Sequence, residues 1–94
     1  MHLEGKHALV TGGGTGIGHA IASALAEAGA EVTITGRRRD VLEQAAGERL
    51  HPVPMDVADE PQVVRGVAEA VAARGHVQIC VANAGIAEGR SLKW

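Results

Sequence analysis

Glycine and threonine crowd one short stretch near the start of the chain, which reads T-G-G-G-T-G-I-G from Thr11 to Gly18. Because glycine has no Cβ, such a turn lets backbone N–H groups come within contact distance of a phosphate. A helix that begins in the turn adds unpaired N–H groups and a positive dipole end. The stretch therefore predicts a phosphate-binding turn, and its alternative is an ordinary glycine-rich turn. The residues expected at this site are Gly12, Gly14, Thr15, Gly16, Ile17 and Gly18.

The spacing of these glycines excludes two common phosphate-binding motifs. A G-x-G-x-x-G fingerprint that begins at Gly12 would need glycine where Ile17 stands. A P-loop would need Gly-Lys followed by Ser or Thr, and no such step follows. The pattern that remains is T-G-x-x-x-G-I-G, with glycine at Gly12, Gly16 and Gly18.

Alternating strands and helices must hold this turn. Short apolar or β-branched runs predict strands, and apolar residues three and four positions apart predict helices. The predicted strands are 7–10, 31–35, 50–57 and 77–82, and the predicted helices are 17–28, 38–46 and a third that starts after Asp59. The expected apolar faces are Ile17, Ile21, Ala24, Leu25 and Ala28 in the first helix, and Val63, Val64, Val67, Ala68 and Val71 in the third. Gly29, Gly47 and Gly75 are expected to close the three helices.

Two of the predicted strands carry further expectations. Pro52 and Pro54 cannot donate hydrogen bonds to a ladder, so their strand should lie at the edge of a sheet. Residues 77–82 are apolar at consecutive positions, which is typical of a strand covered on both faces. Cys80 within that run is then expected to be a buried structural thiol.

The order β-α-β-α-β-α-β predicts an α/β fold. Right-handed crossovers give a Rossmann-type, doubly wound parallel sheet of four strands in the order 3-2-1-4, with helices on both faces. A ligand crevice should open at the carboxyl ends of the strands, beside the first.

Four motifs, taken together and in order, resemble the short-chain dehydrogenase/reductase family. They are the glycine turn, the approach Leu3-Glu4-Gly5-Lys6, the pair Asp56-Val57, and the element Asn83-Ala84-Gly85. The resemblance implies that Asp56 and Val57 end the third strand and contact the adenine, and that Asn83, Ala84 and Gly85 lie along the cofactor. Ala82 stands where the family's N-N-A-G element has its first Asn. Residues 1–94 would thus be the N-terminal half of an NAD(P)-binding Rossmann domain, with 86–94 as an irregular tail.

Three consecutive arginines, Arg37, Arg38 and Arg39, follow the second predicted strand. An NAD-binding site carries a carboxylate near this point for the ribose 2′-hydroxyl, whereas guanidinium groups can pair with a 2′-phosphate. In the family that the chain resembles, a basic residue here favours NADP over NAD. Arg37 is the first candidate contact and Arg38 the second. The alternative is a solvated helix start, in which Arg38 and Arg39 pair with Asp40 or Glu43.

The family's chemistry is hydride transfer between a nicotinamide and an alcohol or carbonyl. A Tyr-x-x-x-Lys pair handles the proton in the family, and a serine orients the substrate oxygen. The 94 residues contain no tyrosine. The chain alone is therefore predicted to be inactive, as a truncated oxidoreductase whose full-length form would be a homo-oligomer. The alternative is a non-catalytic, stand-alone nucleotide-binding or interaction module.

Composition excludes several other classes of protein. Hydrophobic residues make up 46% of the chain, which argues against disorder. The net charge is −2 and there is one aromatic residue, so nucleic-acid binding has no support. The five histidines are dispersed, without the spacing of a zinc site. A single cysteine and the lack of a signal peptide or spanning segment predict a cytoplasmic protein without a membrane partner.

Overall fold

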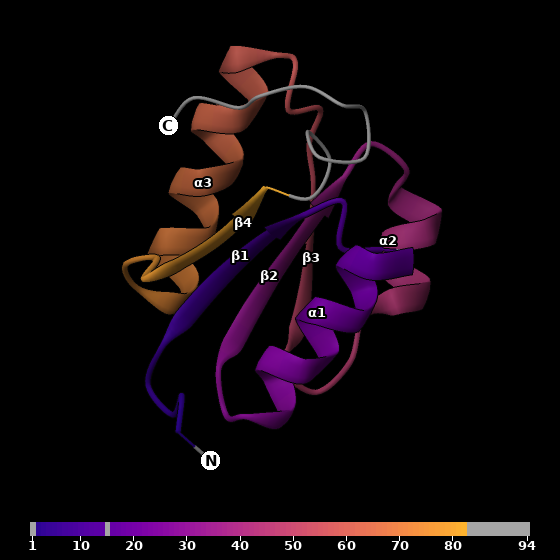
Figure 1. Cartoon of the computed structure of the whole chain (residues 1–94). Coiled ribbons are helices and arrows are strands. Elements are labelled where there is room, and N and C mark those ends of the chain that lie inside the picture. The colour runs from indigo at the N-terminus through magenta and orange to yellow at the C-terminus, as the bar shows by residue number, and fades with distance from the viewer. Residues whose placement is uncertain (1, 15, 83–94) are drawn as a thin grey trace.

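A computed structural model of the chain describes residues 2–14 and 16–82, which form a parallel sheet with helices packed against it (Figure 1). The elements are β1 (His7–Thr11), α1 (Gly16–Glu27), β2 (Glu31–Gly36), α2 (Arg39–Ala45), β3 (Leu50–Pro54), α3 (Glu60–Arg74) and β4 (Ile79–Ala82). The strands lie in the order β3-β2-β1-β4, and every neighbouring pair is parallel. The predicted fold and strand order are confirmed.

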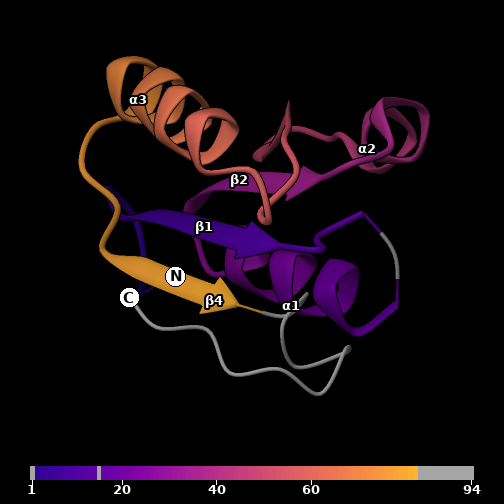
Figure 2. The same cartoon turned by 90° about the horizontal axis from the view of Figure 1, so that it is seen from above.

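The helices cover both faces of the sheet. Viewed from above, α1 lies below β1 and α3 lies on the other side of the sheet (Figure 2). On the α1 side, Ala22 and the α2 residue Leu42 join a buried cluster with the strand residues. The members of this cluster are Ala8, Val10, Ala22, Ala30, Val32, Ile34 and Leu42. With no aromatic side chain among them, the layers are held by small aliphatic groups at close range.

The strand β3 lies at the edge of the sheet, as its prolines predict. The Met55 N–H donates to the Gly36 carbonyl of β2 at 2.9 Å. Because alternate residues of a strand direct their N–H groups to opposite sides, Pro52 and Pro54 direct their ring nitrogens outward. The prolines therefore occupy positions where no ladder bond is lost.

The start of α3 also agrees with the sequence. The Asp59 side chain accepts the Gln62 N–H at the N-terminus of the helix, and a proline stands in the first turn. Gly75 ends this helix with a φ of 89°, and Gly29 follows α1 with a φ of 108°. The expectation for Gly47 is wrong, because α2 ends earlier, at an extended Ala46, and Gly47 has no positive φ.

Two large residues of the predicted helix faces are exposed instead. Ile17 is 72% exposed and Val64 is 63% exposed. The buried positions are Gly18 and Ala22 in α1, and Gly66 and Ala70 in α3. Leu25 nevertheless packs against the core, and Ile21, Val63, Val67 and Val71 are half-buried, so the predicted faces are correct in part. The fully buried helix positions are small residues, because the helices approach the sheet most closely there.

The expectation of a doubly covered fourth strand is also wrong. The strand β4 begins at Ile79 and its residues are at most half-buried, with Cys80 exposed. Cys80 pairs in register with Leu9 and shares its side of the sheet, the side on which α3 packs against β3. Desolvation by the surrounding sheet still raises the pKa of the Cys80 thiol.

Within the described residues, no helix has the length and apolar character needed to cross a membrane.

Candidate nucleotide-binding site

The glycine turn follows the carboxyl end of the central strand β1. The N–H groups of Gly12 and Gly13 both donate to the Thr35 carbonyl, at 2.8 and 3.2 Å. This contact anchors the turn to the carboxyl end of β2. Gly12 has a φ of 68° and Gly16 a φ of 59°, a left-handed conformation that favours glycine. The turn therefore has a fixed shape that depends on its glycines.

Two glycines of the turn are needed for close packing rather than for a positive φ. A Cβ on Gly13 would lie 2.7 Å from Cγ2 of Ile34 in the core. A Cβ on Gly14 would lie 3.1 Å from Cγ1 of Val41 and 3.3 Å from Cδ2 of Leu42. Gly13 was not among the residues predicted from the sequence, because its contact with Ile34 joins two elements and the local residue spacing does not reveal it.

The helix α1 begins at Gly16, directly after the turn, one residue earlier than expected. Its first turn carries no acidic residue, and the leading N–H groups of a helix have no intrahelical acceptor. Gly18 is buried against the sheet, while Ile17 projects to the surface. The N-terminus of α1 is thus suited to bind an anion. Thr15 lies outside the described residues.

A second feature is a hollow of about 500 Å³ beyond the carboxyl ends of β2 and β3. It is lined by Arg37, Arg39, Pro54, Met55, Asp56, Gln62 and Arg65. Three guanidinium groups and one carboxylate give its lining a net charge of +2, although the whole chain carries −2. This concentration of positive charge suits a phosphate.

The three consecutive arginines take different places. Arg37 lines the hollow and has no ion pair among the described residues. Arg38 lies 3.3 Å from Asp40, and both side chains are largely exposed. Arg39 lines the hollow and also lies 3.8 Å from Glu43, one helical turn away. Both ion pairs of the solvated-helix alternative are therefore present, and Arg37 is outside them.

Asp56 lies beside the hollow, in a turn after β3. The strand ends at Pro54, so the expectation that Asp56 and Val57 end the strand is wrong. The Asp56 N–H donates to Oε1 of Gln62 at 2.9 Å, and Oδ1 of Asp56 accepts the Ala58 N–H at 2.9 Å. These bonds fix the turn against the first turn of α3. Asn83, Ala84 and Gly85 lie outside the described residues.

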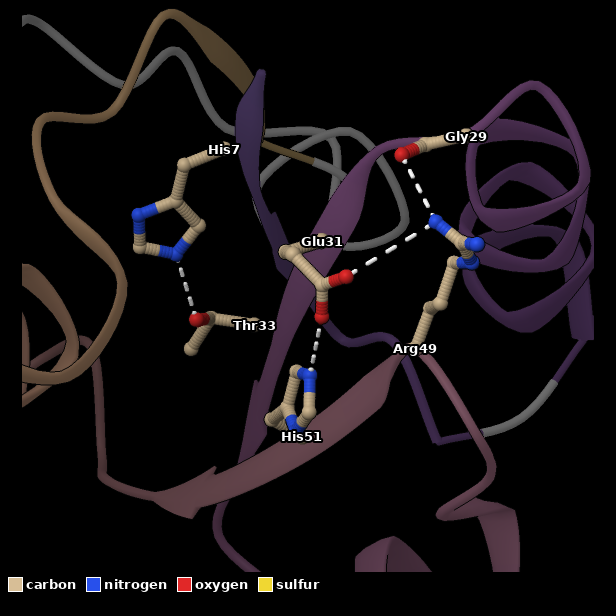
Figure 3. A network of polar contacts seen from close by, with 6 residues as sticks. All are labelled: His7, Gly29, Glu31, Thr33, Arg49 and His51. Atoms are coloured by element: carbon tan, nitrogen blue, oxygen red, sulfur yellow. Dashed lines mark hydrogen bonds and ion pairs between the residues drawn. The ribbon is translucent and has the colours of Figure 1, made fainter. Parts of the chain in front are cut away.

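A separate group of polar contacts lies at the amino end of β2, away from the glycine turn (Figure 3). Glu31 lies 2.7 Å from Nε2 of His51 and 3.7 Å from the Arg49 guanidinium. Arg49 also donates to the Gly29 carbonyl at 3.0 Å. This cluster ties the start of β2 to β3. Among the described residues, no group of three or more His, Cys, Asp or Glu side chains is placed to hold a metal ion.

His7 forms a buried polar bridge near the same end. Its Nε2 lies 2.7 Å from the Thr33 hydroxyl (Figure 3). Its Nδ1 lies 2.9 Å from the Gly75 carbonyl. A carbonyl oxygen only accepts, so Nδ1 donates to Gly75, and Nε2 shares the other hydrogen bond with the Thr33 hydroxyl. The neighbouring Thr35 hydroxyl, also fully buried, has no hydrogen-bond partner among the described residues.

Comparison with known proteins identifies the family of the chain. The family model for short chain dehydrogenases matches residues 6–93. The short-chain dehydrogenase/reductase PhomF of Diaporthe leptostromiformis is 43% identical over 89 residues, 89% of this chain and 30% of that protein. The L-rhamnose 1-dehydrogenase (NADP(+)) of Thermoplasma acidophilum is 40% identical over 93 residues, 92% of this chain and 37% of that protein.

A solved structure shares the fold as well. The 3-ketoacyl-(acyl-carrier-protein) reductase from Brucella melitensis, complexed with NADH, matches with a TM-score of 0.79 and 37% identity. The match covers 83% of this chain and 34% of that one. The chain therefore spans about a third of the length of the relatives it matches. By its family match over nearly its whole length and by its Rossmann-type sheet, the chain belongs to the short-chain dehydrogenase family.

Proposed function

We propose that this chain forms the adenosine- and pyrophosphate-binding part of an NADP-dependent oxidoreductase. The observation that carries the proposal is the arginine-lined hollow beyond β2 and β3, which lies on the same edge of the sheet as the glycine turn. Ligands of doubly wound sheets bind at the carboxyl ends of the strands, next to the strand where the order reverses. Here that strand is β1, which carries the turn.

Each part of the site would hold one part of the cofactor. The pyrophosphate would lie against the backbone of Gly12 to Gly18 and the start of α1. The adenine would lie beside Asp56 and Val57. The family pattern adds Thr15, Asn83, Ala84 and Gly85 along the remaining length of the cofactor.

The choice of NADP rests on charge. Arg37 is the first candidate for the ribose 2′-phosphate, because it lines the hollow and has no carboxylate partner among the described residues. Arg38 is the second candidate, and it would have to leave Asp40 to reach the phosphate. No carboxylate follows β2 at the position where an NAD site would have one. One relative is named for NADP(+) and another was solved with NADH, so the arginines are what favours NADP here.

The bound cofactor would supply a hydride at its nicotinamide, for exchange with an alcohol or carbonyl substrate. The 94 residues hold no tyrosine to move the accompanying proton as a phenol does in the family. We therefore propose that these residues bind the cofactor and do not by themselves catalyse the transfer. The second candidate is a nucleotide-binding module without catalysis.

Calorimetric titration of the 94-residue chain with NADP and NAD tests the cofactor proposal. We expect NADP to bind more tightly, and Arg37→Ala to remove about a tenfold advantage, since hydrogen bonds to charged groups contribute about 1.5–3 kcal/mol. Arg74→Ala is the charge-matched control, because Arg74 stands in the last turn of α3 and does not line the hollow. Equal binding of the two cofactors, unchanged in Arg37→Ala, would contradict the proposal.

Activity separates the two candidate functions. An oxidoreductase should gain alcohol- or carbonyl-dependent turnover of NADP when a polypeptide that carries a Ser and a Tyr-x-x-x-Lys pair completes it. A module should bind NADP as a stable, monodisperse protein and gain no turnover from such a polypeptide.

A further inference from the structure

Arg65 of α3 lines the same hollow as Arg37, although 28 positions separate the two in the chain. It has no ion pair among the described residues, even though Glu69 stands one helical turn further along α3. Opposite charges at this spacing on a helix can form an ion pair. The contacts described above for Asp56 and for the glycine turn do not involve the guanidinium group of Arg65.

The packing of α3 fixes the backbone that carries Arg65. Its neighbour Gly66 is buried, and a Cβ there would lie 3.4 Å from Cγ1 of Val53 and would overlap Cε of Met55. The helix therefore approaches the end of β3 more closely than a larger residue would allow. Met55 itself lines the hollow, so the close approach holds Arg65 at the rim.

Hydrogen bonds at the start of α3 fix the same rim. The Gln62 side chain accepts the Asp56 N–H at 2.9 Å and donates to Oδ2 of Asp59 at 3.1 Å. Asp59 in turn accepts the Gln62 N–H at 3.3 Å. The first turn of α3 and the turn after β3 thus form one unit, and Arg65 follows it by three residues.

The charges in the hollow leave two arginines free for a ligand. The Arg39 guanidinium lies 3.8 Å from the Glu43 carboxylate. Arg37 and Arg65 form no ion pair in the part of the chain that the structure describes. Asp56 contributes one negative charge to the lining, so a single arginine would only balance it. A phosphate dianion needs the second positive charge.

We propose that Arg65 is a specificity-determining residue, which joins Arg37 in binding the ribose 2′-phosphate of NADP. The two guanidinium groups come from different elements, the segment after β2 and the helix α3, and would contact the phosphate together. The inference rests on the proposed function, because it assigns a further residue to the same cofactor site.

The test uses two fragments of the cofactor that differ only in the 2′-phosphate. The 94-residue chain, Arg65→Ala, Arg65→Lys, Arg37→Ala and the control Arg74→Ala are each titrated with adenosine 2′,5′-bisphosphate and with 5′-AMP. Thermal unfolding of each variant checks that it is folded. We expect Arg65→Ala to weaken binding of the bisphosphate about tenfold and of 5′-AMP less than about twofold. Arg65→Lys should retain part of the preference, since lysine keeps the charge without the planar fork.

The outcomes separate this inference from the proposed function. If Arg65→Ala weakens both ligands equally or neither, while Arg37→Ala selectively weakens the bisphosphate, the role of Arg65 is refuted and the NADP site stands. If the unmodified chain binds 5′-AMP as tightly as the bisphosphate, the NADP preference itself fails, and the role of Arg65 fails with it. A selective loss in Arg65→Ala, with Arg74→Ala unchanged, supports the inference.

Discussion

Two threonines of β2 offer a controlled measurement of what a buried hydrogen bond contributes to this fold. Thr33 and Thr35 are both fully buried and lie two residues apart, so their side chains are on the same side of the sheet. The Thr33 hydroxyl lies 2.7 Å from Nε2 of His7, whereas the Thr35 hydroxyl has no partner among the described residues. Substitution by valine keeps the shape of either side chain and removes only the hydroxyl.

The two substitutions should change stability in opposite directions. Thr33→Val leaves Nε2 of buried His7 without its hydrogen-bond partner, and a buried group left unsatisfied costs about 1–3 kcal/mol. Thr35→Val removes a hydroxyl that is buried without a partner, which mutational data place at a cost of about 1–3 kcal/mol. We therefore expect Thr33→Val to be less stable than Thr35→Val by about 2 kcal/mol or more. For a domain of this size, the thermal midpoints should differ by about 10 °C.

Urea unfolding followed by circular dichroism measures both free energies of unfolding. The slope against urea should be the same in both variants, which would show that the surface exposed on unfolding is unchanged. Thr33→Ser, which keeps the hydroxyl, should recover part of the lost stability. The reasoning is refuted if Thr33→Val proves as stable as Thr35→Val.

Two further results follow from the turn and from β4. Gly13→Ala should lower the free energy of unfolding by about 1–3 kcal/mol, because its Cβ would overpack against Ile34. Gly36→Ala should not, since its Cβ would lie at an ordinary 3.6 Å from Cδ2 of Leu42. Equal midpoints of the two variants in thermal unfolding would contradict this expectation. At pH 8, Cys80 should react with iodoacetamide more slowly in the folded chain than in the urea-unfolded chain. The raised pKa of the folded thiol leaves a smaller fraction of it as thiolate at this pH. A pH–rate midpoint equal to that of the unfolded chain would show that the thiol is not desolvated.

The parts of the fold that were predictable depend on local chemistry. Pro52 and Pro54 lack an N–H wherever they stand, so they identified the edge strand without knowledge of its neighbours. Asp59 and Gly75 fixed the ends of α3 through their own backbone and side-chain preferences. The glycine turn was recognisable because its backbone conformation, with a φ of 68° at Gly12 and 59° at Gly16, needs glycine within one short stretch.

The parts that were missed depend on contacts between distant segments. Gly13 matters because Ile34 lies against it, and Arg65 joins the hollow because Gly66 lets α3 approach β3. Cys80 looked buried because its run is apolar, but exposure depends on which helix covers that part of the sheet. Such contacts follow from the packed layers, and hydrophobic spacing within one element does not encode them.

The two edge strands of the sheet differ in their capacity to pair with a further strand. Pairing of a further strand with β3 is disfavoured, because Pro52 and Pro54 offer it no N–H groups, whereas no proline occupies the border strand β4 (Ile79–Ala82). The arginine hollow adjoins the closed border. We therefore expect a strand that joins this sheet to pair with β4, on the side away from the hollow. A strand added at β4 would therefore leave unchanged the arginine-lined surface that we propose distinguishes NADP from NAD.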